Sequence, residues 1–156
     1  MKECKEILLS QGKVALVDVE DYDELSKYKW YAYRDVHTYY AGRNVKNACQ
    51  VRMHRQITHC PEGLEVDHIN RNGLDNRKEN LRICTRSQNC CNFVRKRNVS
   101  GCRGVVPHGP GKWQVFITKN KASLTLGTFD TFEEAVRVRK DAELKFHGDF
   151  VPKVLL

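Results

Sequence analysis

Residues 66–92 carry a carboxylate, an imidazole and several amides at spacings that suit phosphodiester hydrolysis. This reaction needs a divalent cation to offset the phosphate charge and a base to accept a proton from water. Asp67 and Asn89 offer hard oxygen ligands, which suit Mg²⁺ or Mn²⁺ better than Zn²⁺. His68 can serve as the base because its ordinary pKa lies near neutral pH. Asn80 could hold the imidazole ring in orientation, and Asn76 could exchange roles with it.

Two strands and a helix are the elements that must position these side chains. Residues 66–69 and 81–84 are typical of strands, with turn-forming residues between them, and Ser87 is the predicted N-cap of a helix that carries Asn89. Adjacent strand residues point to opposite faces, so Asp67 and His68 can share a site only if the strand ends or bulges there. The turn-rich segment 70–73 favours this. We assign Asn70, Asn72 and Asp75 to turns.

The whole segment resembles the HNH endonucleases, through the phrase DHINRNGLDNRKENLR followed by QN. Within this family, the segment is similar to the phage intron-encoded homing type, in which Asn takes the third position of the family's signature. The resemblance implies a ββα-metal fold in which Asp67 and Asn89 bind the metal ion. It also implies that His68 is the general base and that Asn80 orients it.

Charge is unevenly distributed along the chain of 156 residues, which has a net charge of +8 and a hydrophobic content of 40%. Acidic and basic residues balance over 1–50, whereas Glu79 is the only acidic residue among many lysines and arginines over 77–103. The excess of positive charge therefore lies beside the predicted site, and it indicates an anionic partner.

The cysteines show neither an even disulfide set nor a zinc-binding CxxC pattern. They indicate reduced thiols in a cytoplasm, and for Cys90 and Cys91 we favour burial over zinc ligation. No signal peptide or membrane-spanning run is visible, so a soluble protein is expected. The seven positions are Cys4, Cys49, Cys60, Cys84, Cys90, Cys91 and Cys102.

Residues 1–52 read as a β-rich region that positions the nuclease more than it binds phosphate. Its tyrosines and Trp30 could be a stacking surface for nucleic acid, but a small core is the preferred interpretation. In the short helix that follows, His54 is expected to pack the helix against the hairpin, and Arg55 is the expected phosphate contact. The predicted strands are 7–9, 14–17, 30–34, 39–43 and 49–53, with a short helix beginning in the acidic segment 20–24.

A basic linker, residues 93–102, separates this region from a second pattern of three strands and one helix. Arg95, Lys96 and Arg97 in the linker are expected to follow a DNA backbone. The strands are predicted at 103–106, 112–118 and 124–129. Thr131 and Glu134 form a predicted capping box for the helix, which Gly148 ends.

This C-terminal pattern resembles the plant ethylene-response-factor (APETALA-type) DNA-binding domain, through SGCRGVV, GKWQVFIT, LGTFDTFEEA and KFHGDF. The resemblance implies a three-stranded sheet that lies in the DNA major groove, and Arg103 matches a contact position. Lys112, Lys119 and Lys121 are available for phosphates, whereas Trp113 alternates with apolar residues and is expected in the core.

The sequence predicts a modular α+β protein that binds double-stranded DNA. Its predicted parts are an N-terminal region (1–52), a ββα-metal nuclease (53–92), the linker (93–102) and the DNA-binding domain (103–150). The predicted function is site-preferring DNA cleavage of the homing type by a cytoplasmic, monomeric nicking enzyme with one Mg²⁺ or Mn²⁺ ion. The alternative is a DNA-binding regulator that keeps the hairpin as a scaffold, and an RNA-binding protein is less favoured because no RNA-module signature is present.

Overall fold

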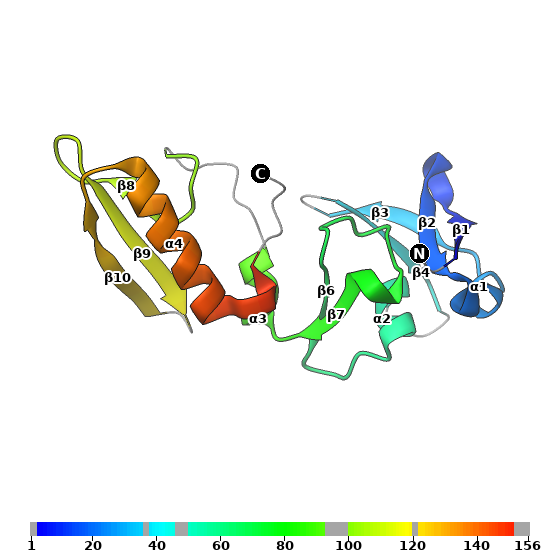
Figure 1. Ribbon diagram of the computed structural model, residues 1–156. Helices are drawn as coiled ribbons and strands as arrows, with labels where there is room; N and C mark the ends of the chain where they lie inside the picture. The colour runs from blue at the N-terminus through cyan, green and yellow to red at the C-terminus, as the bar shows by residue number, and fades with distance from the viewer. Residues whose placement is uncertain (1–2, 36–37, 46–49, 93–99, 120–121, 152–156) are drawn as a thin grey trace. The chain divides into compact units, whose positions relative to one another are not determined.

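The computed structural model in Figure 1 describes residues 3–35, 38–45, 50–92, 100–119 and 122–151. These residues form short helices and small antiparallel sheets of two or three strands, which confirms the predicted α+β class. Two compact units divide between Asn89 and Cys90. Within the described ranges, each helix is too short or too polar to span a bilayer.

The first unit opens with a hairpin of β1 (Cys4–Leu8) and β2 (Val14–Asp18), joined by a 3-10 turn at Ser10–Gly12. The short helix α1 (Val19–Leu25) follows directly. Glu20 and Asp21 lie in its first turn, where the positive end of the helix dipole favours carboxylates. Both the hairpin and the acidic helix are as predicted.

A three-stranded sheet comes next, with the order β3 (Tyr31–Arg34), β4 (Tyr39–Arg43) and β5 (Val51–Arg52). The described part of β5 is shorter than the predicted strand, because helix α2 (Met53–Thr58) begins at Met53, and Cys49 lies outside the described residues. α2 ends at His59, which adopts the left-handed conformation typical of a helix C-terminus.

The hairpin predicted to carry the site consists of β6 (Glu65–His68) and β7 (Leu81–Cys84), and it leads into α3 (Arg86–Asn92). A 3-10 turn at Lys78–Asn80 enters β7. The predicted order of strand, loop, strand and helix is confirmed, and it is drawn in green in Figure 1.

One apolar core fills the first unit. It includes Ala15 and Val17 from β2, Ala32 and Ala41 from the three-stranded sheet, Met53 and Ile57 from α2, and Val66 and Leu81 from the hairpin. Trp30 is also buried here, and its indole N–H donates to the Leu25 carbonyl at 2.8 Å. The core thus contains residues of both the predicted N-terminal region, which ends at residue 52, and the predicted nuclease, which begins at residue 53.

The second unit contains a sheet with the order β10 (Ala122–Phe129), β9 (Trp113–Lys119) and β8 (Val105–Pro107). Helix α4 (Phe132–His147) lies across one face of it (Figure 1). Its core contains Val105, Val115 and Ala135, with Trp113 half-buried against it as expected. The three-stranded sheet with one helix is therefore confirmed.

The ends of α4 follow the sequence signals. The Thr131 hydroxyl accepts a hydrogen bond from the Glu134 N–H at 3.3 Å, and Gly148 is the C-cap residue. β8 begins at Val105 rather than at Arg103. Gly104 precedes it with a φ of 74°, and a Cβ there would collide with the Phe116 carbonyl, so the chain can enter the strand only after this glycine.

Candidate active site in the β6–β7 hairpin

The helix that carries Asn89 begins with a reciprocal cap. The Thr85 hydroxyl accepts from the Gln88 N–H at 3.3 Å, and Gln88 Oε1 accepts from the Thr85 N–H at 2.9 Å. This is a capping box, in which a side chain and a backbone group three residues apart satisfy each other. The prediction that Ser87 is the N-cap is therefore wrong, because Thr85 has the glutamine partner at the required spacing and α3 already includes Ser87.

The loop between β6 and β7, residues 69–80, is held by its own asparagines. Asn70 Oδ1 accepts from the Asn72 N–H at 2.8 Å, and Asn72 Oδ1 accepts from the Leu74 N–H at 3.1 Å. Asp75 is buried and binds the Arg77 guanidinium at 2.8 and 2.7 Å, which lowers the pKa of its carboxyl group. These are Asx-type turns, as assigned from the sequence.

The N-terminal hairpin anchors the same loop. Leu16 of β2 donates its N–H to the Leu74 carbonyl and accepts the Asn76 N–H, both at 2.8 Å. The Asp18 carboxylate accepts the Lys78 N–H at 2.8 Å. The N-terminal region therefore fixes the backbone that surrounds the predicted site, in the positioning role expected for it.

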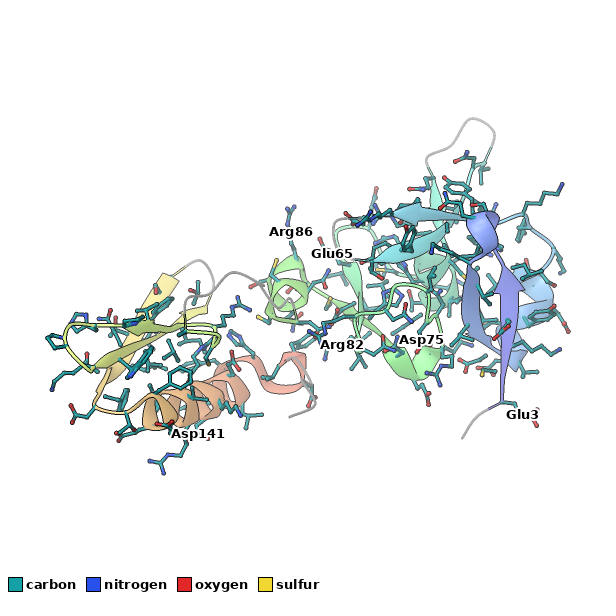
Figure 2. All side chains as sticks on the ribbon, turned by 90° about the horizontal axis from the view of Figure 1, so that it is seen from above. Glu3, Glu65, Asp75, Arg82, Arg86 and Asp141 are labelled. Carbon is teal, nitrogen blue, oxygen red and sulfur yellow. The ribbon has the colours of Figure 1, made fainter. Side chains whose placement is uncertain are left out.

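Asp67 is 5% exposed, and it is paired with Arg82 directly across the hairpin. Its Oδ2 accepts from Arg82 Nε at 2.8 Å and from Arg82 Nη2 at 2.6 Å. Glu65 lies two residues earlier in the strand, and so on the same face of the ribbon as Asp67. Figure 2 shows Glu65 and Arg82 on the hairpin, and Asp75 in the loop between its strands.

Asn89 reaches this face of the hairpin from α3. Its Nδ2 donates to Glu65 Oε2 at 2.7 Å, which fixes the amide so that Oδ1 is the group left for another ligand. Within the described residues, Asn89 Oδ1 accepts no hydrogen bond. Glu65, Asp67 and Asn89 thus offer carboxylate and amide oxygens of the type that Mg²⁺ and Mn²⁺ prefer, so the residues present fit such an ion.

His68 is the last residue of β6, which ends there with unbroken register. The strand ends here without a bulge, and its register places the His68 side chain on the face opposite to that of Asp67. The imidazole is 4% exposed, and its ring centroid lies 5.1 Å from that of His54 and 5.6 Å from that of Tyr40. Burial lowers the pKa of His68, while the Asn76 hydrogen bond and the Asp67 charge oppose that shift.

Asn76 contacts the His68 ring. The distance between Asn76 Oδ1 and His68 Nε2 is 3.4 Å. Asn80 instead closes the loop: its Nδ2 donates to the Asp75 carbonyl at 2.8 Å and to Asn70 Oδ1 at 3.0 Å, and its Oδ1 accepts the Asn70 N–H at 2.9 Å. The geometry therefore favours the alternative that Asn76 orients the ring while Asn80 shapes the loop.

The residues predicted to contact DNA divide into several groups. Arg55 is taken up by the turn after α2, since its guanidinium donates to the carbonyls of Leu64, Cys60 and Pro61 at 2.7 to 3.2 Å. This use of its donors explains why it is half-buried. Lys112 is exposed and pairs with Asp130 at 3.0 Å. Arg103 is exposed in the second unit. Arg95, Lys96, Arg97 and Lys121, and the side chain of Lys119, lie outside the described residues.

Much of the positive charge beside the site is used in ion pairs. Arg77 pairs with Asp75 and Glu79, Lys78 pairs with Glu20 at 2.9 Å, and Arg82 pairs with Asp67. Arg86 is exposed on α3 and projects from it in Figure 2. The positive charge beside the site that is not paired with a carboxylate is therefore smaller than the sequence indicated.

Cys90 is exposed and Cys91 is half-buried, so the burial expected for Cys90 is wrong, and the zinc interpretation of the pair gains no support either. In the described part of the chain, the only cluster of three or more histidine, cysteine or acidic ligands is Asp18, Glu20 and Asp21, which is engaged by Lys78. The described cysteines form no disulfide with one another.

Glu65, Arg82 and Tyr40 belong to the surroundings of the site but were not predicted. Strand alternation places Glu65 beside Asp67, and hairpin register places Arg82 opposite it, so both follow once the register is known. Tyr40 comes from β4, and no local pattern connects it with His68.

Comparisons with known proteins agree with this geometry. Residues 59–90 match the family model described as HNH endonuclease. An uncharacterized HNH endonuclease of Acanthamoeba polyphaga mimivirus is 28% identical over 153 residues, which cover 92% of this chain and 76% of that protein. The comparison with solved structures gave no match. The family suggests DNA nuclease activity, and its members generally use a divalent metal ion. The matched motif lies on a strand, a loop, a strand and a helix, and over residues 59–90 the chain is similar to the HNH endonucleases.

Proposed function

We propose that this protein is a metal-dependent, site-preferring DNA endonuclease of the homing type, which nicks one strand of duplex DNA per monomer. The observation that carries the proposal is the convergence of Glu65, Asp67 and Asn89 on one face of a hairpin whose strand ends at the enclosed His68. One such site per chain supports nicking of a single strand.

Asp67 and Asn89 would hold one Mg²⁺ or Mn²⁺ ion, and Glu65 fixes the Asn89 amide. Such an ion, when bound, offsets the negative charge that develops on the phosphate. Arg82 holds Asp67 in place, and it keeps a positive charge beside the carboxylate in the absence of an ion. Asp67 is thus oriented before any ligand arrives.

His68 would accept the proton of the attacking water. Burial keeps the imidazole neutral at neutral pH, the form that a general base requires. The contact with Asn76 and the rings of His54 and Tyr40 limit its rotation. Pre-orientation of this kind reduces the loss of freedom needed to reach the transition state.

The second unit would select the cleavage position, with Arg103, Lys112, Lys119 and Lys121 at the DNA. The likeness of its sequence to the ethylene-response-factor type and its three-stranded sheet with one helix support this part of the proposal. Arg95, Lys96 and Arg97 would follow the backbone between the units. Such an enzyme would work in the cytoplasm, that of the bacterial host if a phage encodes it.

The test uses supercoiled plasmid with varied sequence. Incubation with Mg²⁺ or Mn²⁺ should convert it to open circles, and EDTA should prevent this. Asp67→Asn should abolish the metal-dependent product, whereas Asp23→Asn, which removes an exposed carboxylate from α1, should not. Tight binding of DNA without any metal-dependent nicking would contradict the proposal and favour the DNA-binding regulator.

A further inference from the structure

The sheet β3–β4–β5 has two faces of different character. Ala32 and Ala41 point into the apolar core. In each strand the side chains next to these alanines, such as Tyr31, Tyr33 and Tyr40, point to the opposite face. The register pairs Tyr33 with Tyr40, and it places Tyr31, Gly42 and Arg52 in one row across the three strands. We call the surface formed by Tyr31, Tyr33, Tyr40 and Arg52 the tyrosine face.

A row of aromatic contacts connects the tyrosine face to His68. The ring centroids of Tyr31 and Tyr33 are 6.3 Å apart, and those of Tyr33 and Tyr40 are 5.8 Å apart in a stacked pair. Tyr40 then contacts the rings of His54 at 5.5 Å and His68 at 5.6 Å. These tyrosines are half-buried and lie outside the apolar core, so the interpretation of the aromatic strands as core holds for Trp30 but not for them.

The polar groups of this face suit an anion. Arg52 is exposed, and its side chain makes no hydrogen bond or ion pair with the described residues. The Tyr33 hydroxyl is enclosed without a hydrogen-bond partner there. Burial raises the pKa of Tyr33 and Tyr40, so both phenols stay protonated and add no negative charge to this face.

Arg52 acts on the same cluster of rings. Its positive charge opposes the upward shift of the pKa of Tyr33 and Tyr40, and it contributes to the lowered pKa of His54. Asp35 follows the other end of β3, and its charge raises the pKa of both tyrosines. A phosphate is therefore favoured at the end where Arg52 and Tyr31 lie, and it is disfavoured beside Asp35.

We propose that the tyrosine face binds the phosphodiester backbone of duplex DNA next to the cleaved bond, with Arg52 paired to a phosphate. The proposal rests on the nuclease function proposed above, because His68 marks the position of the cleaved bond. Tyr33 and Tyr40 stack on each other, and the charged group that this face offers to DNA is the Arg52 guanidinium. The contact is thus to the backbone and independent of sequence.

The proposed contact is tested by measuring how the protein binds a fluorescent duplex in EDTA. The binding is followed by anisotropy over a series of salt concentrations. Arg52→Gln should weaken binding about tenfold and by the same factor for unrelated sequences. It should also reduce the slope of log affinity against log salt by about 0.9, the value for one phosphate contact. Arg34→Gln is the matched control, since Arg34 is exposed on the opposite face of the same sheet and should leave the slope unchanged.

Tyr33→Phe removes only the enclosed hydroxyl and keeps the stacked rings, so it should leave DNA affinity and the salt slope close to those of the wild type. In the nicking assay, Arg52→Gln should raise the DNA concentration for half-maximal rate and leave the maximal rate close to wild type. An Arg52→Gln protein with the wild-type affinity and salt slope would overturn the proposal, as would an equal effect of Arg34→Gln. If the wild-type protein nicks no DNA with either metal ion, the nuclease function fails, whereas the salt series still decides whether this face binds DNA.

Discussion

At His68, the ring is enclosed by side chains from three other segments of the chain: Tyr40 from β4, His54 from α2 and Asn76 from the loop. Close packing of this kind leaves the imidazole few orientations. A general base contributes by position as well as by pKa, since it must lie within hydrogen-bonding distance of the water that it deprotonates.

His68→Ala should therefore lower the rate of plasmid nicking by roughly 10²- to 10⁴-fold, the usual contribution of a general base. The affinity for duplex DNA in EDTA should stay close to that of the wild type, because the substitution removes no positive charge. His59→Asn is the control, since His59 is exposed in a left-handed conformation that Asn tolerates. Unchanged nicking by His68→Ala would place the base elsewhere.

The buried His54 makes stability depend on pH. Burial above all, and then the nearby positive charges, lower its pKa from 6.5 to about 3 in the folded protein. Between these values the unfolded chain binds a proton that the folded protein does not. The stabilisation is fully present above pH 6.5, and it is lost as the pH falls toward 3, by up to about 1.4 kcal/mol per pH unit.

Urea unfolding at pH 7, 6 and 5 measures this dependence. His54→Phe keeps a ring at the site but cannot bind a proton, so its free energy of unfolding should fall less steeply over the same range. His68 also has a lowered pKa and should account for part of the slope that remains. Identical slopes for the two proteins would show that His54 does not take up the proton.

At the scale of elements, the loop 69–80 decides where the site residues lie. It is closed internally by Asn80 and tied to β2 by the hydrogen bonds of Leu16. Gly73 packs against this framework as well: a Cβ there would collide with the Tyr39 carbonyl and the Tyr40 ring. The loop is thus held from both sides, although it has almost no regular secondary structure.

Asn80→Ala should lower the free energy of unfolding by about 2 kcal/mol or more, because it leaves the buried carbonyl of Asp75 and the part-buried N–H of Asn70 without these partners. Asn72→Ala should cost roughly 0.5–1 kcal/mol, since Asn72 is exposed and makes one such bond. Urea unfolding of both variants gives the comparison. Equal losses would mean that the loop is held mainly by its backbone contacts with β2.

For the whole molecule, the two compact units have separate apolar cores. Each unit should then unfold with a free energy of its own. The second unit relies on α4 against its sheet, where Arg139 is buried, donates to the Arg103 carbonyl at 2.7 Å and pairs with Glu143. This buried guanidinium in α4 was not predicted from the sequence.

Ile117→Ala should lower the stability of the second unit by about 2–5 kcal/mol, because Ile117 is 1% exposed and a cavity would remain. Calorimetry should show one transition moved to lower temperature and the other unchanged. Between the two transitions, metal-dependent nicking should persist while site preference is lost. A common shift of both transitions would show that the two cores unfold together.

The sequence alone determined the local features of this protein. The strands 65–68 and 81–84, the Thr131 cap and the Asx turns depend on neighbours within a few residues, so composition and spacing predict them. The motif from Asp67 to Asn89 likewise gave the position of the candidate site. The cap of α3 at Thr85 was also within reach, through the glutamine three residues later.

The tertiary structure decided which partner each of these residues has. Asn76 rather than Asn80 contacts His68, Arg82 pairs with Asp67, and Arg55 binds carbonyl groups instead of remaining exposed. These pairings depend on strand register and on elements that are far apart in the chain. One example is the contact between Tyr40 and His68, the proposed base. A basic side chain looks equally available for phosphate in any sequence, and only the folded chain shows whether a carboxylate or a carbonyl already holds it.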